Sequence, residues 1–158
     1  MRRLLLTLVL LLAASSVLAK DHAAGDFVFM DMKGQAQRLS DYRGKWVLVN
    51  FWATWCPPCL REVPDLIALH EAHKDKDLVV IGVALDSTKE AVQRFVAKHK
   101  VTYPVAVSDY KQAAQVGAVE GLPTTYLFDP SGKAVVSHTG ILTRASVEEY
   151  IRSKSAGK

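Results

Sequence analysis

Few residues in this chain of 158 belong to the types that mark special architectures. Two cysteines are too few for a small domain held together by several disulfides. Nine glycines and six prolines, with no glycine period, exclude collagen-like and low-complexity chains. No repeat has solenoid spacing, and no basic run is long enough to indicate nucleic-acid binding. Apolar residues (49%) and charged residues (23%) stand near globular averages, so the composition predicts one folded domain.

The N-terminus has the pattern of an export signal. A basic start, Met1–Arg3, precedes an apolar run over residues 4–14, and Ala19 completes a plausible cleavage site. An uncleaved membrane anchor is the alternative, but the apolar segment is shorter than the roughly 20 residues that span a bilayer. We therefore predict a cleaved signal peptide over residues 1–19 and one domain over residues 20–158. Cleavage would remove two arginines and lower the formal net charge from +4 to +2.

Beyond this segment, the apolar pattern alternates between strands and helices. Two almost unbroken apolar runs, Trp46–Trp52 and Leu78–Leu85, are typical of strands buried on both faces. Further strands are expected at residues 27–30, 35–39, 105–107, 124–128 and 134–138, and helices after the cysteines, after a Ser87–Glu90 capping box, over 110–116 and after Thr143. The alternation predicts an α/β domain with a mixed central sheet and helices on both faces.

Both cysteines lie in one Cys-x-x-Cys motif, between a predicted buried strand and a predicted helix. Cys56 would lie at the helix N-terminus, where free amides and the helix dipole lower the pKa of a thiol. Cys59 would point back beneath it, so Cys56 should be the more exposed and attack a disulfide, and Cys59 should resolve the mixed disulfide. Pro57 fits the first helical position, and Pro58 removes a second amide that could bond a thiolate. The motif predicts thiol–disulfide exchange with no cofactor besides this cysteine pair.

Other uses of a cysteine pair fit less well. A zinc site would need two more ligands, and the nearest histidines, His70 and His73, lie over two helical turns beyond Cys59. We interpret both as partly exposed helix residues and predict no metal site. A purely structural disulfide would gain little entropy from so short a loop. A copper-binding chaperone remains an alternative because thiolates favour Cu(I), although the motif holds no histidine or methionine.

The helix after the cysteines carries an acid with two interpretations. Leu60, Val63 and Ile67 form its predicted apolar stripe. Glu62 falls three residues after Cys59, close to the same face. If buried, its carboxylate could move protons to or from Cys59. If exposed, it would pair with a neighbouring lysine or arginine, and the spacing alone favours this second interpretation.

Residues around the motif allow three further expectations. Asn50 ends the buried strand and could lie beneath the cysteines, but it does not titrate. Trp52 is expected in the core and Trp55 on an exposed contact surface. The Leu122–Pro123 peptide bond immediately precedes a predicted strand, and the sequence alone does not indicate that it is cis.

Two motifs together resemble the thioredoxin-like proteins of the TlpA/ResA/CcmG type. These are Trp46–Pro64, WVLVNFWATWCPPCLREVP, and Gly121–Asp129, GLPTTYLFD. The resemblance covers about residues 25–155. It implies a thioredoxin fold with an N-terminal β extension and a strand–helix insertion over residues 87–116. Asn50 stands where ordinary thioredoxins have an acid, so the chain is more similar to the exported branch.

The resemblance also implies roles for individual residues. Cys56 would be the nucleophile, Cys59 the resolving thiol, and Glu62 a functional buried acid, which reverses the interpretation from spacing alone. Pro123 would be a cis-proline opposite the disulfide. Substrate contacts would come from Trp55, Pro57, Pro58 and the backbone of Leu122.

Members of this family are exported bacterial thiol–disulfide oxidoreductases. The chain is therefore expected to be a periplasmic, monomeric dithiol reductant of exported proteins such as apocytochrome c. A membrane thiol–disulfide electron donor would re-reduce it. A net disulfide oxidase or isomerase is the alternative within redox enzymes, because the direction depends on a potential that the sequence does not give.

Overall fold

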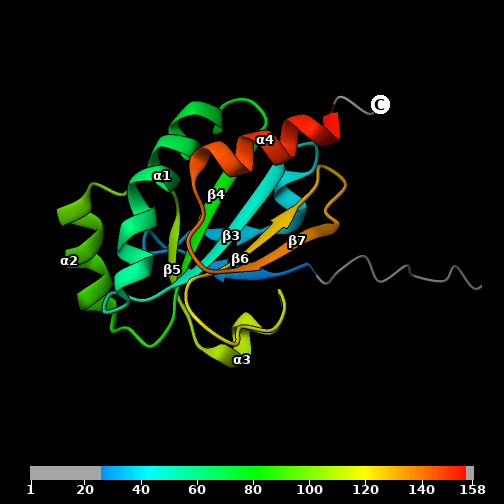
Figure 1. Cartoon of the computed structure of the whole chain (residues 1–158). Helices are drawn as coiled ribbons and strands as arrows, with labels where there is room; N and C mark the ends of the chain where they lie inside the picture. Colours follow the sequence, from blue (N-terminus) through cyan, green and yellow to red (C-terminus); the bar gives the residue numbers. More distant parts are fainter. Residues whose placement is uncertain (1–25, 156–158) are drawn as a thin grey trace, which may run out of the picture.

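The structure, a computed structural model, describes residues 26–155, and a five-stranded sheet forms its centre (Figure 1). In spatial order the strands are β5 (Val105–Val107), β4 (Leu78–Ala84), β3 (Trp46–Trp52), β6 (Thr124–Phe128) and β7 (Ala134–Thr139). The first three are parallel to one another, whereas β6 runs antiparallel to β3 and β7 antiparallel to β6. The mixed central sheet predicted from the sequence is confirmed.

The central strands β3 and β4 are buried along their whole length. Their alternate side chains enter two different cores, as the two-residue period of a strand requires. Trp46, Leu48 and Trp52 enter one core, whereas Val47, Val49 and Phe51 enter the other. Asn50 has the same parity as Leu48 and Trp52, which places its side chain on the first of these faces.

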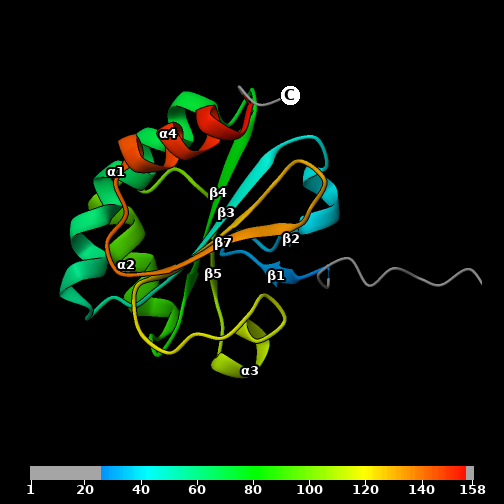
Figure 2. The same ribbon diagram turned by 45° about the vertical axis from the view of Figure 1, so that its right-hand side comes forward.

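Three helices cover that first face: α1 (Pro57–His73), α2 (Lys89–His99) and α4 (Arg144–Ser155) (Figure 2). The other face is covered by a hairpin of β1 (Val28–Met30) and β2 (Ala36–Arg38), by the short helix η1 (Leu39–Tyr42) and by α3 (Tyr110–Ala113). The hairpin is the expected N-terminal extension, and the Met32 amide joins it to the sheet by donating to the Val105 carbonyl at 2.7 Å. The expected insertion over residues 87–116 contains α2, β5 and α3.

Two local predictions were wrong in detail. Thr88, rather than Ser87, caps α2, and its hydroxyl accepts from the Ala91 amide at 3.2 Å. Ser87 is engaged elsewhere, because its hydroxyl accepts from the Thr54 amide at 3.1 Å. The helix expected over residues 110–116 ends at Ala113, and the chain continues as a turn.

The signal peptide predicted over residues 1–19 lies outside the described residues and stays a prediction. Between residues 26 and 155, no helix combines the length and the apolar character needed to cross a membrane.

Candidate active site

The strand directions bring the two sequence motifs together at one edge of the sheet. The carboxyl ends of β3, β4 and β5 meet there because these strands are parallel. Since β6 is antiparallel to β3, it brings its amino end to the same edge. Phe51 pairs with Thr124, so the residues that follow Phe51 lie beside those that precede Thr124. The Cys-x-x-Cys loop and the Leu122–Pro123 segment are thus neighbours.

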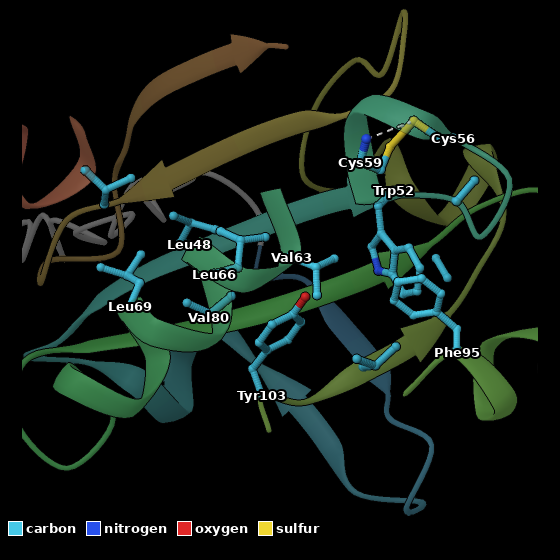
Figure 3. Packing of buried hydrophobic residues seen from close by; sticks show 14 of the residues in the cluster. Leu48, Trp52, Cys56, Cys59, Val63, Leu66, Leu69, Val80, Phe95 and Tyr103 are labelled. Carbon is cyan, nitrogen blue, oxygen red and sulfur yellow. Dashed lines mark hydrogen bonds between the residues drawn. A yellow bond between two sulfur atoms is a disulfide. The ribbon is translucent and has the colours of Figure 1, made fainter. Parts of the chain in front are cut away.

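Cys56 and Cys59 form a disulfide at the start of α1, with Cα atoms 5.3 Å apart. Cys56 is the N-cap residue, and its sulfur accepts from the Cys59 amide at 3.4 Å (Figure 3). Pro57 and Pro58 occupy the first two helical positions and have no amide hydrogen to donate. Cys56 is 3% exposed and Cys59 0%, so the expected difference in exposure is small, and Cys56 alone presents any surface.

Glu62 is completely buried on the face of α1 that carries Cys59. Its Oε1 accepts from the Asn50 side-chain amide at 2.7 Å, and its Oε2 accepts from the Leu142 backbone amide at 3.1 Å. Burial raises the pKa of Glu62, and the two hydrogen bonds offset part of that rise. The exposed ion pair that spacing alone favoured is therefore wrong.

Asn50 connects Glu62 to the sheet. Its side-chain amide also donates to the Thr125 hydroxyl at 3.0 Å, across the β3–β6 pair. Tyr103 is also buried near this group, and burial followed by the negative charge of Glu62 raises its pKa. Thr125, Tyr103 and the Leu142 amide were not predicted. Only Thr125 had a sequence signal, as a polar residue in a predicted buried strand.

The Leu122–Pro123 peptide bond is cis, as the resemblance implied and the sequence alone did not. The Pro123 carbonyl accepts from the Gly140 amide at 2.9 Å, and the Thr124 hydroxyl donates to the Gly121 carbonyl at 2.7 Å. The first bond ties the segment to the residue after β7, and the second lies within the segment. Leu122 is half-buried and Pro123 is buried.

The tryptophans and prolines around the disulfide differ in exposure. Trp55 is 61% exposed, whereas Trp52 is buried and packs against Phe95 with ring centroids 4.7 Å apart (Figure 3). Pro57 is exposed and Pro58 is half-buried. The expected burial of Trp52 and exposure of Trp55 are confirmed, whereas a contact role for Trp55 stays a prediction.

The histidines of α1 have structural contacts. His70 is buried, contrary to the prediction of a partly exposed residue, and its Nδ1 accepts from the Val80 amide at 3.3 Å. Burial lowers the pKa of His70. His73 is half-buried and contacts Asp77 at 2.7 Å and Glu148 at 3.1 Å. Over residues 26–155, no group of three or more histidine, cysteine, aspartate or glutamate side chains is placed to hold a metal ion.

The central strand of this sheet is followed by a helix that begins at a Cys-x-x-Cys disulfide, and a cis-proline lies just before the adjoining strand. This is the architecture of the thioredoxin-fold thiol–disulfide oxidoreductases. Comparison with a solved structure supports the fold: a thiol:disulfide interchange protein of Chlorobium tepidum TLS superposes with a TM-score of 0.76 at 24% identity, over 83% of this chain and 94% of that one. The chain belongs to the AhpC/TSA family, whose model matches residues 21–137.

Relatives with higher identity carry redox names. The thiol-disulfide oxidoreductase ResA of Geobacillus kaustophilus (strain HTA426) is 36% identical over 138 residues, which are 87% of this chain and 79% of the relative. A DsbF homologue from Corynebacterium diphtheriae superposes with a TM-score of 0.74 at 31% identity, over 82% of this chain and 84% of that one. The protein is thus a thioredoxin-like thiol–disulfide oxidoreductase, and the resemblance inferred from its two motifs is confirmed.

Proposed function

We propose that the protein is a periplasmic dithiol reductant of disulfides in exported proteins, apocytochrome c among them. One observation carries the direction of electron flow. The Cys56 sulfur accepts from a single helix amide, that of Cys59, because Pro57 and Pro58 have none to offer. Strong oxidants of this class owe their potential to a stabilised reduced form. A thiolate with one amide donor is stabilised less than a thiolate with several. The reduced form is then less stable, which favours a reducing cysteine pair.

In the proposed reaction, the Cys56 thiolate attacks one sulfur of a substrate disulfide. The substrate S–S bond breaks, and the departing sulfur leaves as a thiolate that takes up a proton. Cys56 and the substrate are then joined by a mixed disulfide. The Cys59 thiolate attacks the Cys56 sulfur, closes the Cys56–Cys59 disulfide and releases the second substrate thiol. Two electrons and two protons pass to the substrate in total.

Glu62 serves the second step of this reaction. Cys59 is 0% exposed, so its thiol cannot lose a proton to bulk solvent, and Glu62 lies one helical turn further along the same face. A carboxylate whose pKa is raised by burial is a better proton acceptor near neutral pH than an ordinary one. We assign Glu62 as the group that takes the Cys59 proton, directly or through one water.

The cellular setting extends this proposal. A net oxidation of the pair in each cycle requires a reductant, and we propose a membrane thiol–disulfide electron donor for that role. The signal pattern over residues 1–19 supports export. We propose that the mature domain acts as a monomer, with substrate contacts at Trp55, Pro57, Pro58 and the backbone of Leu122 beside the cis-Pro123.

Trapping tests the proposed order of attack. Cys59→Ser leaves a mixed disulfide at Cys56 unresolved, so partner proteins should accumulate as adducts on non-reducing gels of cells that express the variant. Cys56→Ser is the matched control and should trap almost nothing, because Cys59 has no exposed surface. Equal trapping by both variants, or none with Cys59→Ser, would contradict the assignment.

A further inference from the structure

An exposed aromatic surface is held in place beside the disulfide. The indole nitrogen of Trp55 donates to the Asp86 carbonyl at 2.9 Å, although the ring is 61% exposed. The Thr54 amide donates to the Ser87 hydroxyl at 3.1 Å, so the loops after β3 and β4 are joined at two points. Trp55 is therefore fixed next to Cys56 with most of its surface in water.

A second exposed aromatic ring belongs to the same surface. Tyr110 opens α3, after β5, and is 43% exposed. Partial burial, followed by a hydrogen bond to the Asp86 carboxylate, raises the pKa of the Tyr110 phenol. Asp86 therefore adjoins both rings: its carbonyl accepts from the Trp55 indole, and its carboxylate lies near the Tyr110 phenol. We name Trp55, Asp86 and Tyr110 the aromatic shelf.

Asp86 is held in a conformation that aspartate adopts only occasionally. Its φ is 47°, in the left-handed region, where asparagine and aspartate are tolerated better than most residues. Such positions persist where surrounding contacts determine them. Here the Trp55 bond and the neighbouring Ser87–Thr54 bond do so.

The loops around the shelf carry acidic side chains. The loops at this edge of the sheet, residues 53–56, 85–88, 108–109, 117–123 and 140–143, carry three acids and no lysine or arginine. The acids, Asp86, Asp109 and Glu120, are all exposed. Across residues 26–155, no ion pair involves any of them. Lys89 and Lys111, both exposed, and Arg144, which is paired with Glu148, lie within two residues of these loops, so the acidic excess belongs to the loops themselves.

We propose that the aromatic shelf binds a cationic side chain, arginine or lysine, that lies next to the reactive cysteine of a partner protein. The inference rests on the proposed function and specifies its substrate class. A cation satisfies both features of the surface, because aromatic faces attract it and the Asp86 carboxylate, which has no ion pair within residues 26–155, neutralises it. Trp55 adjoins Cys56 in sequence, so a cation held on the shelf would bring its neighbouring cysteine to the Cys56 sulfur.

Matched peptides test this specificity. Three short peptides differ only at the residue beside cysteine, which is arginine, alanine or glutamate, and each cysteine carries a 2-nitro-5-thiobenzoate group in a mixed disulfide. The reduced full chain attacks this disulfide and releases the coloured thiolate, which is followed by absorbance. We expect the arginine peptide to react about fivefold faster than the alanine peptide, and the glutamate peptide to react most slowly. Raised salt should reduce the difference.

Two variants identify the source of the preference. Asp86→Asn removes the charge and keeps a residue that tolerates positive φ, so it should remove most of the preference for arginine. Asp75→Asn is the matched control, since Asp75 is an exposed acid in the turn before β4, at the opposite edge of the sheet. It should leave the preference unchanged. Wild type and Asp75→Asn should reduce uncharged hydroxyethyl disulfide at equal rates, and the rate of Asp86→Asn on this substrate is used to normalise its peptide rates.

Each outcome separates the inference from the proposed function. If the wild-type chain reduces all three peptides at equal rates, the shelf does not select a cation and the inference is overturned, while the reductase proposal stands. The same conclusion follows if Asp75→Asn and Asp86→Asn lower the preference equally. If the chain reduces none of the peptides, the proposed function fails first.

Discussion

The Asn50 side chain donates to Glu62 at 2.7 Å and so ties the central strand to the helix that carries both cysteines. This bond and the Leu142 amide at 3.1 Å keep a carboxylate in place in a core made mostly of apolar side chains. Burial raises the pKa of Glu62, whereas the two donors limit the rise. The acid is thus held on the helix face of Cys59, a cysteine with no contact with solvent, and its pKa lies above the ordinary value.

Removal of the Glu62 carboxyl should slow the second half of the reaction. Glu62→Gln keeps the size of the side chain but cannot accept the Cys59 proton. We expect resolution of the mixed disulfide to slow by about 10²-fold, and the first attack by Cys56 to change little. Rapid-mixing measurements with a chromogenic mixed disulfide separate the two steps. Glu71→Gln, an exposed acid on the same helix, is the control, and an equal loss in both variants would refute a specific role for Glu62.

The same acid should make the stability of the oxidised protein depend on pH. The folded pKa of Glu62 lies above its ordinary value of 4.5, so the folded state holds the proton more tightly than the unfolded state. Stability should fall as pH rises from about 4.5 through the folded pKa, because the unfolded chain binds fewer protons there. Urea unfolding of the oxidised protein at several pH values measures this slope. Glu62→Gln should reduce the slope across this range, and an unchanged slope would mean that Glu62 titrates normally.

Pro58 should keep the disulfide reducing. Pro58→Ala introduces an amide in the first turn of α1 that can donate to the Cys56 thiolate. One added hydrogen bond of about 1 kcal/mol to the reduced form corresponds to a rise of about 20 mV in the reduction potential. The pKa of Cys56, measured from the pH dependence of alkylation, should fall. Pro64→Ala, further along the same helix, should change neither quantity. A lower potential in Pro58→Ala would contradict the account.

The fold could be predicted from the sequence because its central strands are almost purely apolar. Trp46–Trp52 and Leu78–Ala84 have no competing interpretation as exposed segments, and both form the middle of the sheet. The sequence does not determine the N-cap of α2, where several polar residues stand together. Ser87 and Thr88 can each cap α2, and the choice depends on the distant Thr54, with which Ser87 shares a hydrogen bond.

The position of Glu62 was misjudged from spacing because the buried stripe of α1 was centred on the wrong residues. Leu60 and Ile67 are only half-buried, whereas Cys59, Glu62 and His70 are buried. The stripe is therefore rotated toward Cys59, and two titratable residues lie on it. The Leu142 amide that bonds Glu62 lies 80 residues away in sequence, and no local pattern identifies it.

The reduction potential of the Cys56–Cys59 pair tests the central claim most directly. The full chain is equilibrated in glutathione or dithiothreitol buffers of known potential, and its free thiols are counted at each. The account predicts about −220 mV or lower, in the range of glutaredoxins and thioredoxin. A value near about −120 mV, typical of a strong disulfide donor, would contradict the proposed direction of electron flow.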